Sequence, residues 1–162
     1  MKDELQNLID DCDTELSDIE SRIQELPPLD KGVRYLTNYA IIKAAGTAEL
    51  VYRSIVADHF SQLSNNRIDT YLDATVRYGQ MSAKYEQMCN LLKRFDIAWC
   101  SSFKAAVGAD PNGQRMQDAS NSLVTNRHSF AHGNNPTATF NDIKQYFQDV
   151  VDLIKIFDSI VC

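Results

Sequence analysis

The sequence predicts an all-α fold, an antiparallel helical bundle of four to five long helices with one short extra helix. Apolar residues recur at spacings of three and four along several long segments, which is typical of amphipathic helices. Clusters of proline and glycine separate these segments. Neither the alternating pattern of a β-strand nor an internal repeat is found in the sequence. At 162 residues the chain fits one domain, so we expect residues 1–162 to form a single unit.

Two long helices are predicted in the first third of the chain. The first runs from about Lys2 to Leu26 and ends at Pro27-Pro28, because proline cannot continue a helix. The second runs from about Val33 to Leu63 and is rich in alanine and branched apolar residues. Gly46 lies within it and indicates a kink or a close approach of another helix. The apolar stripe of the first helix consists of Leu5, Leu8, Ile9, Cys12, Leu16, Ile19, Ile23 and Leu26.

The middle of the chain predicts one short and one long helix. Within residues 64–80, apolar residues at helical spacing indicate a short helix with a loop on each side. A third long helix is expected from Ser82, as its N-cap, to about Val107. Its expected core face consists of Tyr85, Met88, Leu92, Phe95 and Trp99.

The last two helices follow the turn sequence GADPNG at residues 108–113. One helix is predicted from about Gln114 to His132, with Gly133 in the C-terminal cap position. The last helix opens at Thr139, which forms a Thr-x-x-Asp capping pattern with Asp142. Its apolar face consists of Phe140, Ile143, Phe147, Val150, Val151, Ile154 and Phe157.

The net charge of −6 is unevenly distributed along the chain. Residues 1–30 hold ten acidic and two basic side chains, a net charge of −8, whereas residues 31–162 carry a net charge of +2. From Ala119 to Asn141 there is no aspartate or glutamate. A polyanion could approach that stretch without repulsion, although a polar helix end followed by a loop has the same composition.

Composition favours a globular, reduced, cytoplasmic protein. Apolar residues make up 44% and charged residues 23% of the chain. No apolar run reaches the roughly 18 residues of a membrane span, and the N-terminus lacks the features of a signal peptide. We therefore expect no membrane partner. The four cysteines are scattered without a Cys-x-x-Cys pair, as expected of reduced thiols, and they are Cys12, Cys89, Cys100 and Cys162.

The run RHSFAHG at residues 127–133 combines an arginine with two of the three histidines. It resembles the signature of the HEPN superfamily, Arg-x(4–6)-His with a polar residue directly after the arginine, here His128. The stretch NYAIIKAAGTAELVYR at residues 38–53 also resembles the second helix of small prokaryotic HEPN proteins from toxin–antitoxin and antiviral systems. Members of that superfamily are helical bundles that dimerise, and many are metal-independent endoribonucleases.

The resemblance implies an RNA substrate, a homodimer, and a cognate antitoxin or other regulatory protein as a possible partner. Some HEPN toxins carry a tyrosine two places after the motif histidine, which a partner enzyme modifies. This chain has Asn134 at that place, so control by such a modification is not expected. We include Asn134 among the predicted substrate-binding residues.

The chemistry of the motif side chains agrees with RNA cleavage. The 2′-hydroxyl of RNA can act as nucleophile, which requires a base, an acid for the leaving oxygen, and a cation for the charged phosphorane. Arg127 is a planar fork that suits two phosphate oxygens, and His132 is the principal acid or base. His128, one turn earlier on the same face, orients the site or binds substrate. Two motifs that face each other across a two-fold axis would form one composite site.

Glu49 is the one acidic candidate for the site, and we include it among the substrate-binding residues. It could position Arg127, or it could be a buried helical glutamate that pairs with Arg53. The sequence leaves both possibilities open.

Other functions are compatible with parts of the same run. His128 and His132 have the spacing of two metal ligands, but no acid or cysteine lies near them in sequence, so neither a metal nor a cofactor is expected. Ser129 beside two histidines could indicate a hydrolase, but no strand–turn–helix elbow surrounds it. The alternative from a different class is a catalytically silent HEPN module that binds RNA, a nucleotide or a protein.

Overall fold

The computed structural model describes residues 1–27, 29–61 and 66–161, and every regular element in these ranges is helical. This confirms the all-α class. The elements are α1 (Asp3–Glu25), α2 (Lys31–Ser61), α3 (Asn66–Leu72), the π-helical turn η1 (Asp73–Arg77), α4 (Tyr85–Phe95), α5 (Ile97–Ala109), α6 (Gly113–Ala131) and α7 (Phe140–Val161). The predicted ends at Pro28 and Leu63 lie outside the described residues.

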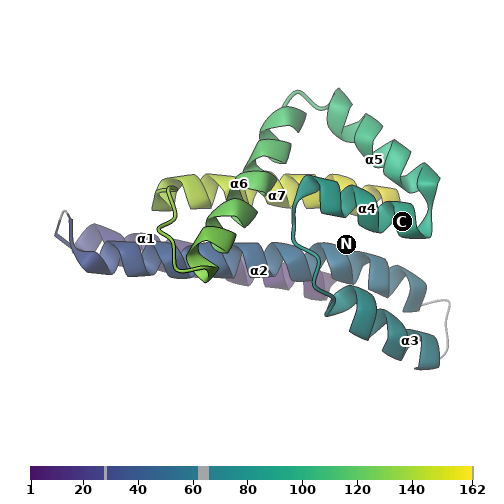
Figure 1. Cartoon of the computed structure of the whole chain (residues 1–162), viewed down its shortest axis with the longest axis horizontal. Coiled ribbons are helices and arrows are strands. Elements are labelled where there is room, and N and C mark those ends of the chain that lie inside the picture. Colours follow the sequence, from purple (N-terminus) through teal and green to yellow (C-terminus); the bar gives the residue numbers. More distant parts are fainter. Residues whose placement is uncertain (28, 62–65, 162) are drawn as a thin grey trace.

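Three long helices, α1, α2 and α7, lie along the long axis of the molecule (Figure 1). α1 and α2 are antiparallel, and α7 packs against both α2 and α6. α6 crosses this layer obliquely, and its C-terminal end lies over α2 (Figure 1). α4 and α5 form a second antiparallel pair beside α7. The motif at the end of α6 is therefore placed over the middle helix of the bundle.

The core brings together large side chains from α2, α5 and α7. Phe157 makes edge-to-face contacts with Tyr52, at 5.8 Å between ring centroids, and with Phe103, at 5.4 Å. All three side chains are fully buried. The Tyr52 hydroxyl donates to the carbonyl oxygens of Met81 and Ser82, so this polar atom is satisfied inside the core. The same hydrogen bonds attach the segment before α4 to α2.

The prediction of one long helix from Ser82 to Val107 is wrong, because the chain breaks between α4 and α5. α4 ends at Phe95, and Asp96 has extended backbone angles, φ −150° and ψ 123°. The Asp96 carboxylate accepts the N–H of Ala98 at 2.7 Å and caps α5. The apolar spacing continues on both sides of the break, so periodicity did not reveal it.

Two finer expectations are also corrected. Ser82 is not an N-cap, because α4 begins at Tyr85 and Lys84 occupies the cap position. Gly46 is not a site of close approach, because a Cβ atom added there would meet nothing within 4 Å and α2 continues through it.

The predicted capping pattern before α7 is confirmed. The Thr139 hydroxyl accepts the N–H of Asp142 at 3.2 Å, and the Asp142 carboxylate accepts the N–H of Thr139 at 2.8 Å. The Thr139 hydroxyl also donates to the Asp142 carboxylate at 2.7 Å, and this bond, together with the one from the Thr139 N–H, holds the pKa of Asp142 below its ordinary value. The start of α7 fixes the far end of the loop that follows His132.

Among the described helices, none combines the length and apolarity that a membrane crossing needs. Cys12, Cys89 and Cys100 are free thiols and are buried, whereas Cys162 lies outside the described residues. Burial raises the pKa of Cys12 to about 11, so this thiol is protonated at neutral pH.

Candidate active site at the end of α6

The motif occupies the last turns of α6 and the residues that terminate it. His132 is the C-cap, and Gly133 follows in the left-handed region with φ 76°. The N–H of Gly133 donates to the carbonyl of Phe130 at 3.0 Å, and the N–H of Asn134 donates to that of Ser129 at 2.9 Å. This pair of bonds is a Schellman motif, which satisfies the last carbonyls of the helix. Glycine is favoured at 133 because a side chain raises the energy of a positive φ.

The two imidazole rings lie side by side on the surface. The ring centroids of His128 and His132 are 4.2 Å apart, with an angle of 60° between the ring planes. Both residues are exposed. The four-residue spacing places them on one face of the helix, as the sequence predicted. Two imidazoles, the side chain that general acid–base catalysis uses most often, are thus available to a ligand at one point.

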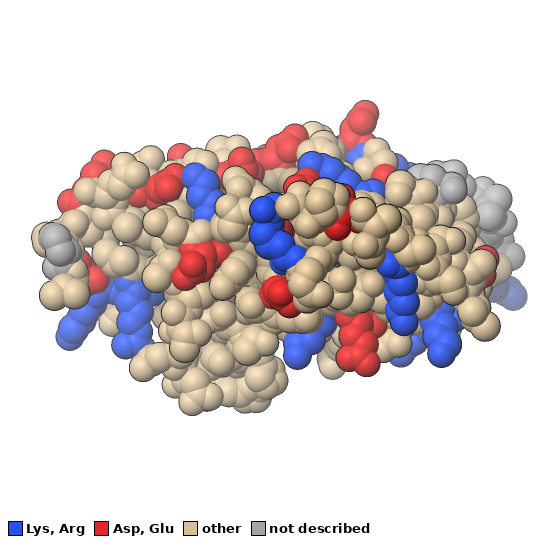
Figure 2. All heavy atoms as spheres, turned by 90° about the horizontal axis from the view of Figure 1, so that it is seen from above, with Lys and Arg blue, Asp and Glu red and all other residues tan. Residues whose placement is uncertain are grey.

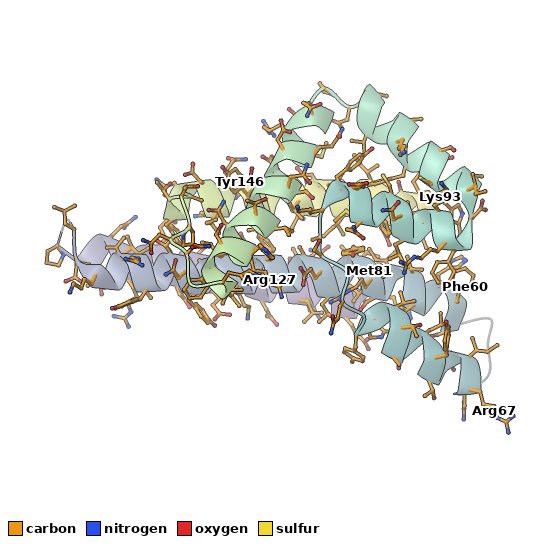
Figure 3. The ribbon with its side chains drawn as sticks, in the orientation of Figure 1. Phe60, Arg67, Met81, Lys93, Arg127 and Tyr146 are labelled. Carbon is orange, nitrogen blue, oxygen red and sulfur yellow. The ribbon has the colours of Figure 1, made fainter. Side chains whose placement is uncertain are left out.

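The guanidinium of Arg127 is held in place by a buried carboxylate on α2. This guanidinium forms an ion pair with Glu49, at 2.5 Å between Nη1 and Oε1, where the end of α6 lies over α2 (Figure 3). The side chain of Glu49 is 8% exposed and that of Arg127 is 40% exposed. Burial raises the pKa of Glu49, and the charge of Arg127 opposes this rise. The carboxylate therefore holds one edge of the guanidinium while another part faces solvent.

The alternative pairing of Glu49 with Arg53 is not the one that the structure contains. The Arg53 Nε atom donates to the backbone carbonyl of Glu49 at 2.8 Å, and its Nη1 atom donates to the carbonyl of Gly79. Its charge acts on Glu49 only at longer range, where it lowers the pKa less than Arg127 does. Glu49 thus contacts the motif arginine, which is 78 positions away in sequence.

Asn126 is a positioning residue that the sequence reasoning missed. It is buried, and its Oδ1 atom accepts the N–H groups of Thr137 and Ala138 at 3.0 and 3.1 Å. Its Nδ2 atom donates to the Ser122 carbonyl at 2.9 Å. Asn126 therefore ties the loop after His132 back to α6. The signal that the sequence offered was an amide side chain directly before the motif arginine, inside the predicted helix.

A surface pocket of about 580 Å³ lies on the α4 side of the motif. Arg127 and His128 form one wall together with other α6 residues, and Lys84 and its neighbours form the other. His132 and Asn134 are not part of the described lining, although the ring of His132 touches that of His128. The structure thus gathers Arg127, Glu49 and the two histidines, and it leaves Asn134 exposed in the adjoining loop.

The electrostatic setting of the site follows from the uneven charge of the chain. Figure 2 shows acidic side chains gathered along the upper edge of the molecule, the side on which α1 lies behind α2 in Figure 1. The described lining of the pocket contains no aspartate or glutamate. Within the described residues, no group of three or more His, Cys, Asp or Glu side chains is placed to hold a metal ion.

One comparison with known proteins gave a match. The family model described as RiboL-PSP-HEPN matches residues 7–162, which is nearly the whole chain. Comparisons with curated proteins and with solved structures gave no match.

Proposed function

Because the chain belongs to the RiboL-PSP-HEPN family, we propose that it is a metal-independent endoribonuclease of the toxin or antiviral effector type. Family membership by itself suggests a ribonuclease or a nucleotide-binding module. The observation that carries the finer proposal is the cluster at the end of α6. There an arginine anchored by a buried carboxylate lies in the same turns as two exposed, adjacent imidazoles.

The proposed reaction is an in-line attack of the RNA 2′-hydroxyl on the neighbouring phosphorus. The 2′-oxygen forms a bond to phosphorus and gives its proton to an imidazole. The bond from phosphorus to the 5′-oxygen breaks, and that oxygen receives a proton from an imidazolium. The products are a 2′,3′-cyclic phosphate and a 5′-hydroxyl end. His132 is the principal acid or base, and His128 orients it or binds substrate.

Arg127 stabilises the negative charge that develops on the phosphorane oxygens. Its guanidinium has five N–H donors, and the ion pair with Glu49 occupies only part of this set. Because Glu49 is buried and fixed on α2, it restricts the rotamers of Arg127 before substrate arrives. A preorganised cation stabilises the transition state without reorganising during the reaction. We assign Asn134, which is exposed in the adjoining loop, to binding of the RNA backbone.

A homodimer would bring two such clusters into one composite site. The surface that supports this is an exposed stripe on α2 made of Tyr35, Tyr39 and Ile42, with exposed fractions of 67%, 48% and 45%. These residues share a helix face, and that face adjoins the side of α2 that carries Glu49. In the proposed homodimer, a second copy covers this stripe and its own α6 end lies near Arg127. A cognate antitoxin or other regulatory protein could block the enzyme by covering the exposed histidines.

Purified protein is expected to cleave single-stranded RNA or a tRNA in the presence of EDTA. Metal removal should leave the rate unchanged, because the proposed chemistry uses only side chains. End-group analysis should find a 2′,3′-cyclic phosphate and a 5′-hydroxyl. Cleavage that stops on chelation would contradict the mechanism. Tight binding of RNA, a nucleotide or a protein without any cleavage would favour the catalytically silent module instead.

Substitution of Ile42→Asp is expected to dissociate the dimer and to abolish most RNA cleavage at low protein concentration. A charge at the end of this stripe nearest Glu49 would be desolvated without a partner in the interface. Sedimentation velocity measures the oligomeric state, and cleavage assays at several protein concentrations measure the coupling to activity.

The matched control is Ile97→Asp, because Ile97 is another exposed isoleucine, at the start of α5, with 69% exposure. That variant should remain dimeric and active. An Ile42→Asp protein that is fully active as a monomer would refute the composite site.

A further inference from the structure

The pocket beside Arg127 has a second wall that the motif does not account for. Ser82, Lys84 and Gln87 form this wall, opposite Arg127 and His128 on α6. The pocket has a volume of about 580 Å³, which lies in the range of sites that hold a nucleotide-sized ligand. Lys84 is exposed and is the N-cap residue of α4. The pocket therefore has a cationic side chain on each side.

The segment that presents Lys84 is fixed to the core by buried hydrogen bonds. The Tyr52 hydroxyl donates to the carbonyl oxygens of Met81 and Ser82 at 3.2 and 3.0 Å. The Ser120 hydroxyl donates to the carbonyl of Ala83 at 2.5 Å. Both hydroxyl-bearing residues are fully buried. The backbone on the N-terminal side of Lys84 is thus held by α2 and α6, the two helices that form the candidate site.

The same segment also lies against the anchor of the motif arginine. The backbone N–H of Ala83 acts on the carboxylate of Glu49 and lowers its pKa, and the same carboxylate pairs with Arg127. One buried carboxylate therefore lies between the segment that carries Lys84 and the Arg127 guanidinium.

The ammonium group of Lys84 is available to a ligand. It forms no ion pair with the described residues, whereas four other lysines pair with carboxylates. These are Lys2, Lys43, Lys144 and Lys155. An exposed lysine that faces an acid-free pocket attracts a phosphate, because each such contact releases counterions from the nucleic acid.

We propose that Lys84 binds an RNA phosphate that neighbours the scissile one, with the intervening nucleoside in the pocket between α4 and α6. The scissile phosphate is at Arg127, and the polar side chains of Ser82 and Gln87 contact the nucleoside. This inference rests on the proposed ribonuclease function and adds a substrate-binding residue to it. Lys84 positions the strand and takes no part in proton transfer.

Lys84→Ala is expected to raise KM for single-stranded RNA by about 10-fold and to leave kcat within about 2-fold, because one phosphate contact is lost. In the inactive His132→Ala background, filter binding of a single-stranded RNA of mixed sequence measures affinity directly. The slope of log Kd against log salt concentration should fall by about 0.7, as for one phosphate contact to a single strand. Lys84→Arg should retain most of the affinity and of the slope.

The matched control is Lys93→Ala. Lys93 is exposed in the last turn of the same helix, and Figure 3 shows it well away from Arg127. Its loss should change neither KM nor the salt slope. Circular dichroism checks that each variant retains its helical content.

The outcomes separate this inference from the function on which it rests. Cleavage by the wild type with an unchanged KM and salt slope in Lys84→Ala overturns the inference and leaves the nuclease in place. A fall in kcat at constant KM overturns it as well, because it would place Lys84 in the chemical step. RNA binding without cleavage, weakened by Lys84→Ala, supports the subsite and refutes the enzyme. A protein that neither cleaves nor binds RNA refutes both.

Discussion

Replacing His132 by alanine is expected to slow RNA cleavage by about 100-fold or more, because general acid–base catalysis by one side chain contributes that much. His132 is exposed just after the last turn of α6, and its ring contacts that of His128. The substitution removes no buried surface, so the thermal midpoint should stay near that of the wild type. Single-turnover assays at saturating protein measure the chemical step without a contribution from binding.

The other two histidines provide graded controls for this result. His128→Ala should reduce cleavage less than His132→Ala, since His128 orients the site or binds substrate. His59→Ala should have no effect on cleavage, because the His59 ring packs against Phe60 and Trp99 elsewhere in the molecule. Wild-type rates in His132→Ala would rule out its role as acid or base.

Arg127→Ala is expected to reduce kcat by about 100- to 1000-fold, the usual effect of removing one preorganised donor to a developing oxyanion. Arg127→Lys should restore only part of this activity, because an ammonium is a point charge and cannot bind two phosphate oxygens as a fork. Cleavage rates of the two variants, compared at saturating RNA, measure the contribution of the fork geometry. Equal activity of the lysine variant and the wild type would contradict the assigned role.

The same substitution should make stability more dependent on pH. Burial already raises the pKa of Glu49 above its ordinary value of 4.5, and Arg127 is the strongest influence that opposes the rise. Without Arg127 the pKa of Glu49 rises further, so the folded chain binds this proton more tightly than the unfolded chain. The free energy of unfolding should therefore fall as pH increases from about 4.5 through the raised value. Urea titrations across this pH range measure the effect, and Glu49→Gln in the Arg127→Ala background should remove it.

Local sequence signals were sufficient to predict most of the helices. Proline at 27, glycine at 133 and the Thr139–Asp142 pair each act within one helical turn, so the ends that they determine lie close to the predicted ones. The break at Asp96 was missed because the apolar residues of α4 and α5 keep a helical spacing across it. Aspartate is a strong N-cap residue, but its effect depends on whether α5 packs in line with α4 or folds back.

The candidate site was predictable only as far as its residues are neighbours in sequence. Arg127, His128 and His132 lie within six positions, and helical geometry alone brings the imidazoles together. The contact of Glu49 with Arg127 depends on how α6 crosses α2, so the sequence left Arg53 as an equal alternative. No local pattern in the sequence marks Lys84, because the segment that carries it is placed by buried partners in α2 and α6.

The left-handed backbone at Gly133 determines how α6 ends, and so where the imidazole of His132 lies. Any side chain at this position would disfavour the reversal of the chain by about 1–2 kcal/mol. This strain would act directly on the neighbouring C-cap residue His132, whose ring lies beside that of His128. Residue 133 is thus a position at which a substitution would shift an imidazole of the candidate site without altering any of the site's own side chains.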